Sequence, residues 1–520
     1  MSTGPADWAG DLQEDFCLSW ALLERHEDEG RGAAPCIHER NRTWTYAEVT
    51  NRSRRAHSVL EEAGVGVGDR VLVSLDDGID FAAAVFATLR MGAILTMVNP
   101  RLTADDMAHY WDYTGAAAGL VAAAGDEAFR RGHARAGSMG RILAADEFST
   151  AIEASDPESK AHRGGPDLEC CWLFTSGSTG QSKGARHTQA HFAFNTATYA
   201  HDVLALGPSD VTAAVSKLFF GYATGINLFF PLAVGASAAL FPERSTPEAV
   251  LDAVERHGVT FLSMVPTTMA KILDLGDLDG RDLTSLRLSV SAGEALPPAL
   301  ASRWRETLGI DVLDGIGSAE MFHIYISQRA SEDAPGSLGR LVRGYDVRLV
   351  GPDGEDVADG ESGTLWVKGG SKLLGYHDDS EKTGATCVGD WVVTGDVFRL
   401  EADGLFYYEG RADDLLKIGG IFVSPLEVEE VVRAHGDVSE VCVSAYPDAD
   451  GLDKPVAFVV VAEGADEDAE GLQAHCRERL VGYKVPRRFR FLDELPRNDR
   501  GKVQRTLLRE RARTEGAGSE

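Results

Sequence analysis

Short runs of β-forming residues alternate with helix-periodic segments along most of this chain, and this alternation constrains the fold most. Residues 70–74 (Arg-Val-Leu-Val-Ser) form one such run, and residues 81–91 then carry apolar side chains at helical spacing. Comparable β-rich runs return at residues 259–263, 286–290 and 310–313. Repeated β-α units predict an α/β fold, in which helices cover a largely parallel sheet.

The predicted secondary structure changes after about residue 336. Residues 345–350, 363–368 and 405–408 read as short strands that Gly, Asp and Pro turns separate. This spacing predicts a small antiparallel β subdomain next to the α/β layers.

The charge balance excludes several classes of partner. The 520 residues contain 51 Lys/Arg against 81 Asp/Glu, a formal net charge of −30. Such a surface repels nucleic acid and anionic lipid, so we expect neither as a partner. No apolar run reaches the roughly 18 residues of a membrane span, and the acidic N-terminus lacks the pattern of a signal peptide. Seven scattered cysteines without a CxxC pair read as reduced thiols, so we expect a cytoplasmic protein.

The strongest local signal is the loop Leu-Phe-Thr-Ser-Gly-Ser-Thr-Gly-Gln-Ser-Lys-Gly at residues 173–184. Glycines let the backbone approach a ligand closely, and successive amides, hydroxyls and a lysine supply donors for an anion. It is not a Walker A loop, because Ser182 precedes and Gly184 follows Lys183. The loop predicts a phosphate cradle made by Thr175, Ser176, Gly177, Ser178, Thr179, Gly180 and Lys183.

This loop resembles the signature of the acyl-adenylate-forming superfamily, which includes acyl- and aryl-CoA ligases, adenylation domains and luciferases. Residues 314–320, 394–396, 410–417 and 496–505 are similar to four further motifs of that superfamily, in order. The resemblance spans residues 172–505 and is less distinct before them.

The resemblance implies that a carboxylic acid attacks ATP to give an acyl-adenylate and pyrophosphate. Glu320 would hold Mg²⁺, Lys502 would bridge the carboxylate and the α-phosphate, and Lys183 would contact phosphate. Asp396 would bind the ribose hydroxyls, with Arg411 as a further donor. The other nucleotide-binding residues implied by the motifs are Gly293, Glu294, Ala295, Asp314, Gly315, Ile316 and Gly317.

Residues 218–225, 289–297 and 315–325 are most similar to the benzoate-CoA ligase branch. The acyl pocket implied by this resemblance is lined by Gly221, Tyr222, Thr224, Ala292, Gly317, His323 and Ile324. This is a flat apolar slot for a single ring. Benzoate ligases tend to have alanine and leucine where Gly221 and Thr224 stand. We expect a larger and more polar slot, and therefore a ring-substituted benzoate as substrate.

Three other positions depart from the superfamily pattern. Ala319 stands where threonine is usual, so a hydroxyl contact to the α-phosphate would be missing. Gln189 replaces a second histidine after the phosphate loop, and Ser182 replaces a common proline.

The resemblance also implies a second half-reaction with coenzyme A. A small, mobile α+β C-terminal domain (residues 413–520) would swing about Asp413 against a large N-terminal domain (residues 1–412). Gly419 and Gly420 would line the thiol tunnel. Residues 477–513 hold 13 Lys/Arg against five Asp/Glu, which favours a surface for the phosphates of coenzyme A.

Two alternatives stay open at this point. The acyl group could pass to a carrier-protein thiol or to an amine, or the chain could be a non-catalytic nucleotide-binding or sensory protein. Glu320, Asp396, Arg411 and Lys502 argue against the non-catalytic reading. We expect a monomer or a homodimer.

Overall fold

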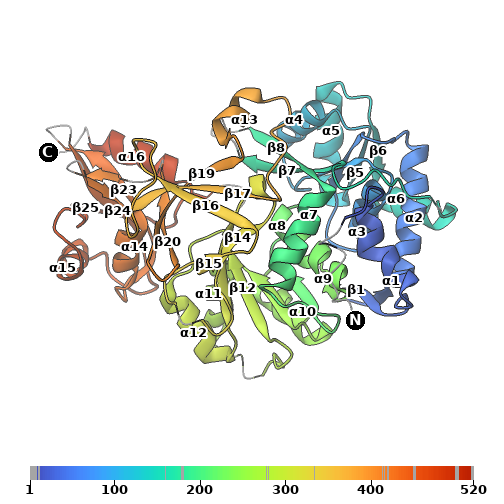
Figure 1. The fold of residues 1–520 in the computed structure, drawn as a ribbon. Coiled ribbons are helices and arrows are strands. Elements are labelled where there is room, and N and C mark those ends of the chain that lie inside the picture. The colour runs from blue at the N-terminus through green and yellow to red at the C-terminus, as the bar shows by residue number, and fades with distance from the viewer. Residues whose placement is uncertain are drawn as a thin grey trace. The chain divides into compact units, whose positions relative to one another are not determined.

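The structure is a computed structural model in which the chain forms two compact units (Figure 1). The first unit consists of Met1–Asp346 and Val367–Val392, and the second of Val347–Trp366 and Val393–Glu520. The predicted domain of residues 1–412 includes parts of both units, and its boundary stays a prediction. The structure describes residues 9, 12–158, 160–176, 181–276, 278, 280–332, 334–412, 414, 416–418, 421–448, 452–497 and 503–516.

A six-stranded sheet in the first unit has the order β6-β5-β3-β4-β7-β8. Its strands are parallel except for β8, which runs antiparallel to β7. The strands are β3 (Arg70–Ser74), β4 (Ile94–Met97), β5 (Ala118–Val121), β6 (Arg141–Ala144), β7 (Glu169–Ser176) and β8 (Ser182–Thr188). The helical segments of this part of the chain are η2 (Trp20–Glu24), α1 (Arg25–Asp28), α2 (Tyr46–Glu62), α3 (Ile79–Arg90), α4 (Ala104–Thr114), η3 (Ala123–Gly125), α5 (Asp126–Ala136) and α6 (Ala145–Ala154). The predicted β-α pair at residues 70–91 is therefore confirmed.

A nine-stranded sheet, also in the first unit, has the order β15-β14-β13-β12-β11-β9-β10-β1-β2. The run from β13 to β1 is parallel. β2 pairs antiparallel with β1, β14 pairs antiparallel with β13, and β15 pairs antiparallel with β14, so β15 runs in the direction of the parallel strands. The strands are β1 (Pro35–Glu39), β2 (Arg42–Thr45), β9 (Val211–Ala214), β10 (Ser237–Ala239), β11 (Phe261–Met264), β12 (Leu288–Ala292), β13 (Val312–Gly317), β14 (Ile324–Ser327) and β15 (Arg340–Leu341). The helical segments are α7 (Gln189–Asn195), η4 (Thr196–His201), α8 (Gly221–Thr224), η5 (Gly225–Phe229), α9 (Phe230–Val234), α10 (Pro247–His257), α11 (Pro266–Asp274), α12 (Pro298–Leu308), η6 (Ala319–Met321) and α13 (Ser380–Thr386). Each strand predicted at residues 259–313 is present, and each begins two residues later than the predicted run.

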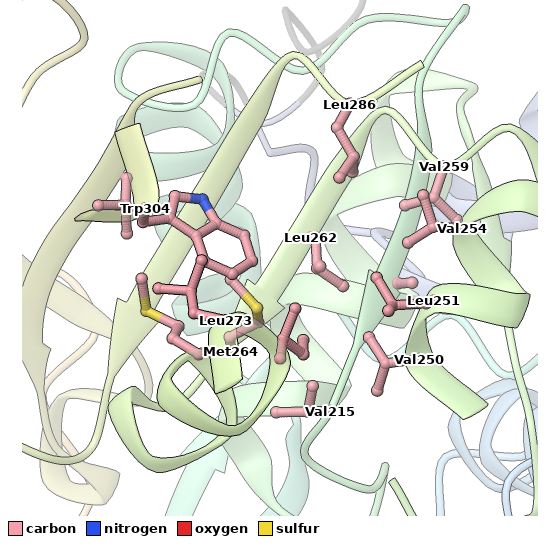
Figure 2. Packing of buried hydrophobic residues seen from close by; sticks show 14 of the residues in the cluster. Val215, Val250, Leu251, Val254, Val259, Leu262, Met264, Leu273, Leu286 and Trp304 are labelled. Atoms are coloured by element: carbon pink, nitrogen blue, oxygen red, sulfur yellow. The ribbon is translucent and has the colours of Figure 1, made fainter. Parts of the chain in front are cut away.

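The core of this part of the unit lies between β11 and helices α10, α11 and α12 (Figure 2). Leu262 on β11 packs with Val254 of α10, Leu273 of α11 and Trp304 of α12, all buried. All four residues of β11 are buried, which is typical of a strand that other strands flank in a helix-covered parallel sheet. This packing confirms the predicted α/β fold.

The second unit contains antiparallel strands, as predicted from the short strand-like runs after about residue 336. β20 pairs antiparallel with β19, and a separate three-stranded sheet has the order β23-β24-β25. The strands are β16 (Tyr345–Val350), β17 (Ser362–Gly369), β18 (Cys387–Val388), β19 (Trp391–Leu400), β20 (Phe406–Arg411), β21 (Leu416–Ile418), β22 (Ile421–Val423), β23 (Val438–Pro447), β24 (Asp453–Val461) and β25 (Arg488–Phe491). The helices are α14 (Pro425–Arg433), α15 (Ala469–Arg479) and α16 (Arg505–Gly516). Strands β16, β17 and β19 contain the points where the chain passes from one unit to the other, and β18 belongs to the first unit.

Among the described helices, none has the length and apolar character needed to cross a bilayer.

Replacing Leu262 by alanine tests the core shown in Figure 2. The side chain is buried and well packed, so Leu262→Ala should lower the free energy of unfolding by about 2–5 kcal/mol. Thermal unfolding measures the change. Val67→Ala, at a side chain that is 58% exposed, serves as the control and should differ from the parent by less than about 0.5 kcal/mol. Equal melting temperatures for both variants would contradict this packing.

Candidate active site

The predicted phosphate loop closes a β-hairpin. Ser176 at the end of β7 pairs with Ser182 at the start of β8, and Thr175 pairs with Lys183. A strand therefore follows the loop, whereas a helix follows the loop of a P-loop nucleotide site. Gly177, Ser178, Thr179 and Gly180 and the side chain of Ser176 lie outside the described residues, so their contacts with phosphate stay predictions.

Lys183 has an acidic partner that the sequence reading did not identify. Its ammonium forms an ion pair with Asp379, and the same carboxylate accepts a hydrogen bond from the Lys382 amide (2.8 Å) at the start of α13. The hydrogen bond from Lys183 is the main reason that the pKa of Asp379 is lowered. Phosphate contact by Lys183 therefore requires its ammonium to leave Asp379 or to be shared with it.

Helix α4 fixes the β8 side of the phosphate loop. The Tyr113 hydroxyl accepts a hydrogen bond from the Gly184 amide (3.1 Å) and donates one to the His377 carbonyl (2.7 Å). His109, one turn earlier on α4, contacts the Ser182 carbonyl through Nε2 at 2.9 Å. Neither side chain is among the residues predicted from the sequence. Their i, i+4 spacing on a helix was the available signal for a shared face.

Glu320, the predicted magnesium ligand, lies in the turn η6 that follows β13. The Tyr376 hydroxyl donates a hydrogen bond to Glu320 Oε1 (2.5 Å), and the Glu320 carbonyl accepts one from the Leu373 amide (2.8 Å). Burial and the adjacent carboxylate raise the pKa of Tyr376. The segment before α13 therefore supplies partners for both Glu320 and Lys183.

Two buried histidines hold the backbone just before Glu320. His187 Nε2 lies 2.7 Å from the Ala319 carbonyl, and His187 Nδ1 lies 2.9 Å from His191 Nδ1. Burial lowers the pKa of His187 to about 4 and that of His191 to about 3, so both rings are neutral near pH 7. His187 accordingly donates to Ala319 and accepts from His191.

Gln189, which replaces a usual histidine, has a structural role. Its side-chain amide donates to the Gly165 carbonyl (2.9 Å), and its oxygen accepts from the Leu18 amide (2.5 Å). The side chain is buried. It ties the N-terminal segment to the start of α7.

The register of β12 and β13 brings two predicted nucleotide-binding segments together. Ala292 pairs with Gly315 in this parallel register, so residues 293–295 follow β12 at the edge of the sheet where residues 315–317 end β13. Burial raises the pKa of Asp314 on β13 to about 7. Glu294 accepts hydrogen bonds from the Thr267 amide (3.2 Å) and hydroxyl (2.8 Å), so its carboxylate caps α11.

Two of the residues predicted to line the acyl slot, Tyr222 and His323, have stacked rings. The rings of Tyr222 and His323 lie 5.1 Å apart at an angle of 22°, and His323 Nε2 donates to the Tyr222 carbonyl (3.2 Å). Burial lowers the pKa of His323 to about 3, so the ring is neutral. The Tyr222 hydroxyl accepts from Ser263 (3.0 Å), which fixes the far end of the tyrosine.

Gly221 and Thr224 were expected to make the acyl slot larger and more polar than in benzoate ligases. Their contacts in the structure differ from that expectation. A Cβ at Gly221 would lie 2.9 Å from the side chain of Leu173, which already fills that space. The Thr224 hydroxyl donates to the carbonyls of Leu218 and Phe220, so it adds no open hydrogen-bonding group. The expected polarity from Thr224 is therefore wrong, because the hydroxyl is used by the backbone.

The predicted ribose-binding pair lies in the second unit. Asp396 on β19 faces Arg411 on β20 in the antiparallel register, and Arg411 donates to Asp396 Oδ1 (3.1 Å) and to the Thr394 carbonyl (2.9 Å). Asp396 is buried, and the Thr394 hydroxyl accepts from its amide (3.1 Å). The structure thus joins these two predicted residues in one cross-strand pair.

Four predicted residues lie outside the described residues, and their roles stay predictions: Lys502, Asp413, Gly419 and Gly420.

The basic stretch at residues 477–513 is partly neutralised within the second unit. Arg505 forms a two-pronged ion pair with buried Glu429 (2.7 and 2.8 Å). Further ion pairs join described residues of this stretch to acidic residues elsewhere in the unit: Lys484–Glu427, Arg497–Glu440 and Arg509–Asp414. The expectation of a basic surface for coenzyme A is weakened to that extent.

Comparisons with known proteins agree with this set of segments. The AMP-binding enzyme family matches residues 24–377, and the AMP-binding enzyme C-terminal domain matches residues 427–502. A benzoate–CoA ligase of Thauera aromatica is 36% identical over 508 residues, which cover 96% of each chain. A 4-hydroxybenzoate–CoA/benzoate–CoA ligase of Rhodopseudomonas palustris is 34% identical and covers 95% of this chain and 94% of its own. The solved anthranilate CoA ligase AuaEII, in complex with anthranoyl-AMP, has a TM-score of 0.93 at 34% identity and covers 98% of this chain and 99% of its own.

Gly317 tests the close packing between β13 and the His323 backbone. A Cβ at this position would lie 2.4 Å from the His323 carbonyl oxygen and 2.8 Å from the Ile324 amide. Gly317→Ala should therefore destabilise the first unit by about 1–3 kcal/mol, measured by thermal unfolding. In the control Gly384→Ala on α13, the new Cβ has no neighbour within 4 Å, so stability should stay equal or rise slightly. Similar melting temperatures for the two variants would refute the close approach.

Proposed function

This chain belongs to the AMP-binding enzyme family, and from that premise we propose that it is an AMP-forming aryl-CoA ligase. It activates a benzoate-type carboxylic acid with ATP, releases pyrophosphate, and then forms the coenzyme A thioester with release of AMP. The observation that carries the aryl substrate class is the stacked pair of Tyr222 and neutral His323 beside Gly317. Flat apolar surfaces of this kind suit one aromatic ring.

The first step joins two anions, so the protein mainly positions them and stabilises negative charge. The phosphate loop donates amides and hydroxyls to the triphosphate, and Lys183 adds a positive charge. Asp396 accepts hydrogen bonds from the ribose hydroxyls while Arg411 holds that carboxylate in place. Lys502 supplies the ammonium that bridges the acid and the α-phosphate. The carboxylate oxygen attacks the α-phosphorus, and the bond to pyrophosphate breaks.

Glu320 is a suitable ligand for Mg²⁺, because a carboxylate oxygen is the donor that this ion prefers. Within the described part of the chain, no three His, Cys, Asp or Glu side chains gather as a metal cluster. One protein carboxylate together with substrate phosphates is a common magnesium site in nucleotide enzymes. When bound, Mg²⁺ neutralises phosphate charge. The Tyr376 hydroxyl orients Glu320 for that role.

The second step needs the sulfur of coenzyme A at the acyl carbon. The thiol attacks the acyl-adenylate carbonyl, the C–S bond forms, and AMP leaves. We propose that the C-terminal part of the chain, residues 413–520, moves about Asp413 to withdraw Lys502. Gly419 and Gly420 then leave room for the pantetheine arm.

Pyrophosphate release measured with a panel of aryl, heteroaryl and alicyclic acids tests the proposal. With ATP and Mg²⁺, benzoate, hydroxybenzoates and aminobenzoates should give the highest kcat/KM, and free coenzyme A should be needed for continued AMP release. Lys502→Ala should lose most adenylation and still bind ATP. Acyl-AMP that accumulates with coenzyme A and is consumed by a carrier protein or an amine would favour the other acceptors. No pyrophosphate with any acid would overturn the proposal.

Tyr376→Phe tests the orientation of Glu320. The variant removes only the hydroxyl that holds the carboxylate, so the Mg²⁺ concentration for half-maximal activity should rise roughly tenfold. The KM for the aryl acid should stay within twofold. Tyr483→Phe, at an exposed tyrosine, is the matched control. An unchanged Mg²⁺ requirement in Tyr376→Phe would separate Tyr376 from the metal site.

A further inference from the structure

Asp77 is a buried carboxylate that connects the two sheets of the first unit. It follows β3 of the six-stranded sheet, and its side chain is only 5% exposed. Asp77 Oδ1 accepts a hydrogen bond from the Leu218 amide (3.0 Å), which lies after β9 of the nine-stranded sheet. None of the roles assigned above uses this carboxylate.

Lys217 completes a charged pair at the same junction. Its ammonium lies 3.9 Å from Asp77 Oδ2, donates to the Phe241 carbonyl (2.7 Å) and lies 4.0 Å from the centre of the Phe241 ring. Burial raises the pKa of Asp77 to about 6 and lowers that of Lys217. Desolvated charges of this kind are retained at a cost, so pure packing does not explain them.

The junction continues directly into the wall of the acyl slot. The Leu218 carbonyl accepts a hydrogen bond from the Thr224 hydroxyl, at the end of α8. Thr224 also lies 3.6 Å from the sulfur of Met97 on β4, the neighbour of β3. Leu218 is therefore held on its amide by Asp77 and on its carbonyl by Thr224. Between these two points the chain carries Gly221 and Tyr222, whose ring stacks on His323.

We propose that Asp77 is a positioning residue for the aryl substrate, acting through Leu218 and Thr224 to set the place of α8 in the acyl slot. The inference rests on the proposed function, because it assumes that α8 contacts the aryl acid. Asp77 itself does not touch substrate in this role. It fixes the distance between Tyr222 and the rest of the slot, and thereby which rings fit.

The role predicts a selective effect on one substrate. Loss of the carboxylate frees the Leu218 amide and shifts α8, but it leaves Lys183, Glu320 and Asp396 with their own partners. The KM for the aryl acid should therefore rise while the KM for ATP stays constant. A general loss of folding would instead reduce the amount of active enzyme and leave both KM values unchanged.

The experiment measures pyrophosphate release by the full-length enzyme for Asp77→Ala and Asp77→Asn, with benzoate and the best acid of the panel. Asp77→Ala should raise the KM for the aryl acid at least tenfold with the KM for ATP within twofold. Asp77→Asn keeps an acceptor for the Leu218 amide and should recover most of that loss. The control Asp76→Asn changes the adjacent carboxylate, which forms an ion pair with Arg101 (3.5 Å), and should match the parent.

Thr224→Val tests the other end of the same connection with little change in volume. It should raise the KM for the aryl acid, and the double variant with Asp77→Ala should raise it no further. If Asp77→Ala yields no folded protein by thermal unfolding, Thr224→Val decides the matter. An unchanged aryl-acid KM in folded Asp77→Ala or in Thr224→Val, or equal changes in both KM values, overturns the role of Asp77. A parent enzyme that activates no aryl acid overturns the proposed function instead.

Discussion

The parallel pairing of β12 with β13 is the constraint on which the site in the first unit depends. Because Ala292 faces Gly315, the chain must leave both strands at one edge, and the turn with Glu320 follows at once. Parallel strands end with polar backbone groups that need partners when helices cover both faces of the sheet. In this protein side chains from distant segments meet part of that demand. The His187 ring on the Ala319 carbonyl and the Asp77 carboxylate on the Leu218 amide are two examples.

The sequence was sufficient to predict several strands and one helix, because apolar periodicity is a local property. The strand at residues 70–74 and the helix after it are present with nearly the predicted bounds. The predicted pair Asp396 and Arg411 also meets, since two strands joined by a short turn lie side by side. In these cases, a local sequence pattern and a short connection between strands were enough to predict the structure.

The partners of the predicted residues could not be predicted in the same way. Tyr376 is separated from Glu320 by 56 positions, and Asp379 from Lys183 by 196. No periodicity links such positions, because the contact arises only when residues 374–377 lie along the edge of β8. The hydroxyl of Thr224 shows a different error, because its predicted role in the slot is absent from the structure. Its residue type indicated a polar slot, but the nearby backbone carbonyls take the hydrogen bond first.

The ion pair of Lys183 with Asp379 bears on how the phosphate loop discriminates among anions. A cation that already forms an ion pair gains less binding free energy from a weak anion than an unpaired cation does, because the existing ion pair must first break. A small, singly bound anion offers little beyond that one contact. On the proposed function, a triphosphate would also contact the loop amides and the metal, which would offset the loss of the pair. We therefore expect Asp379 to favour ATP over free phosphate at this loop. It also keeps the lysine ordered, since the carboxylate is itself fixed by the Lys382 amide at the start of α13.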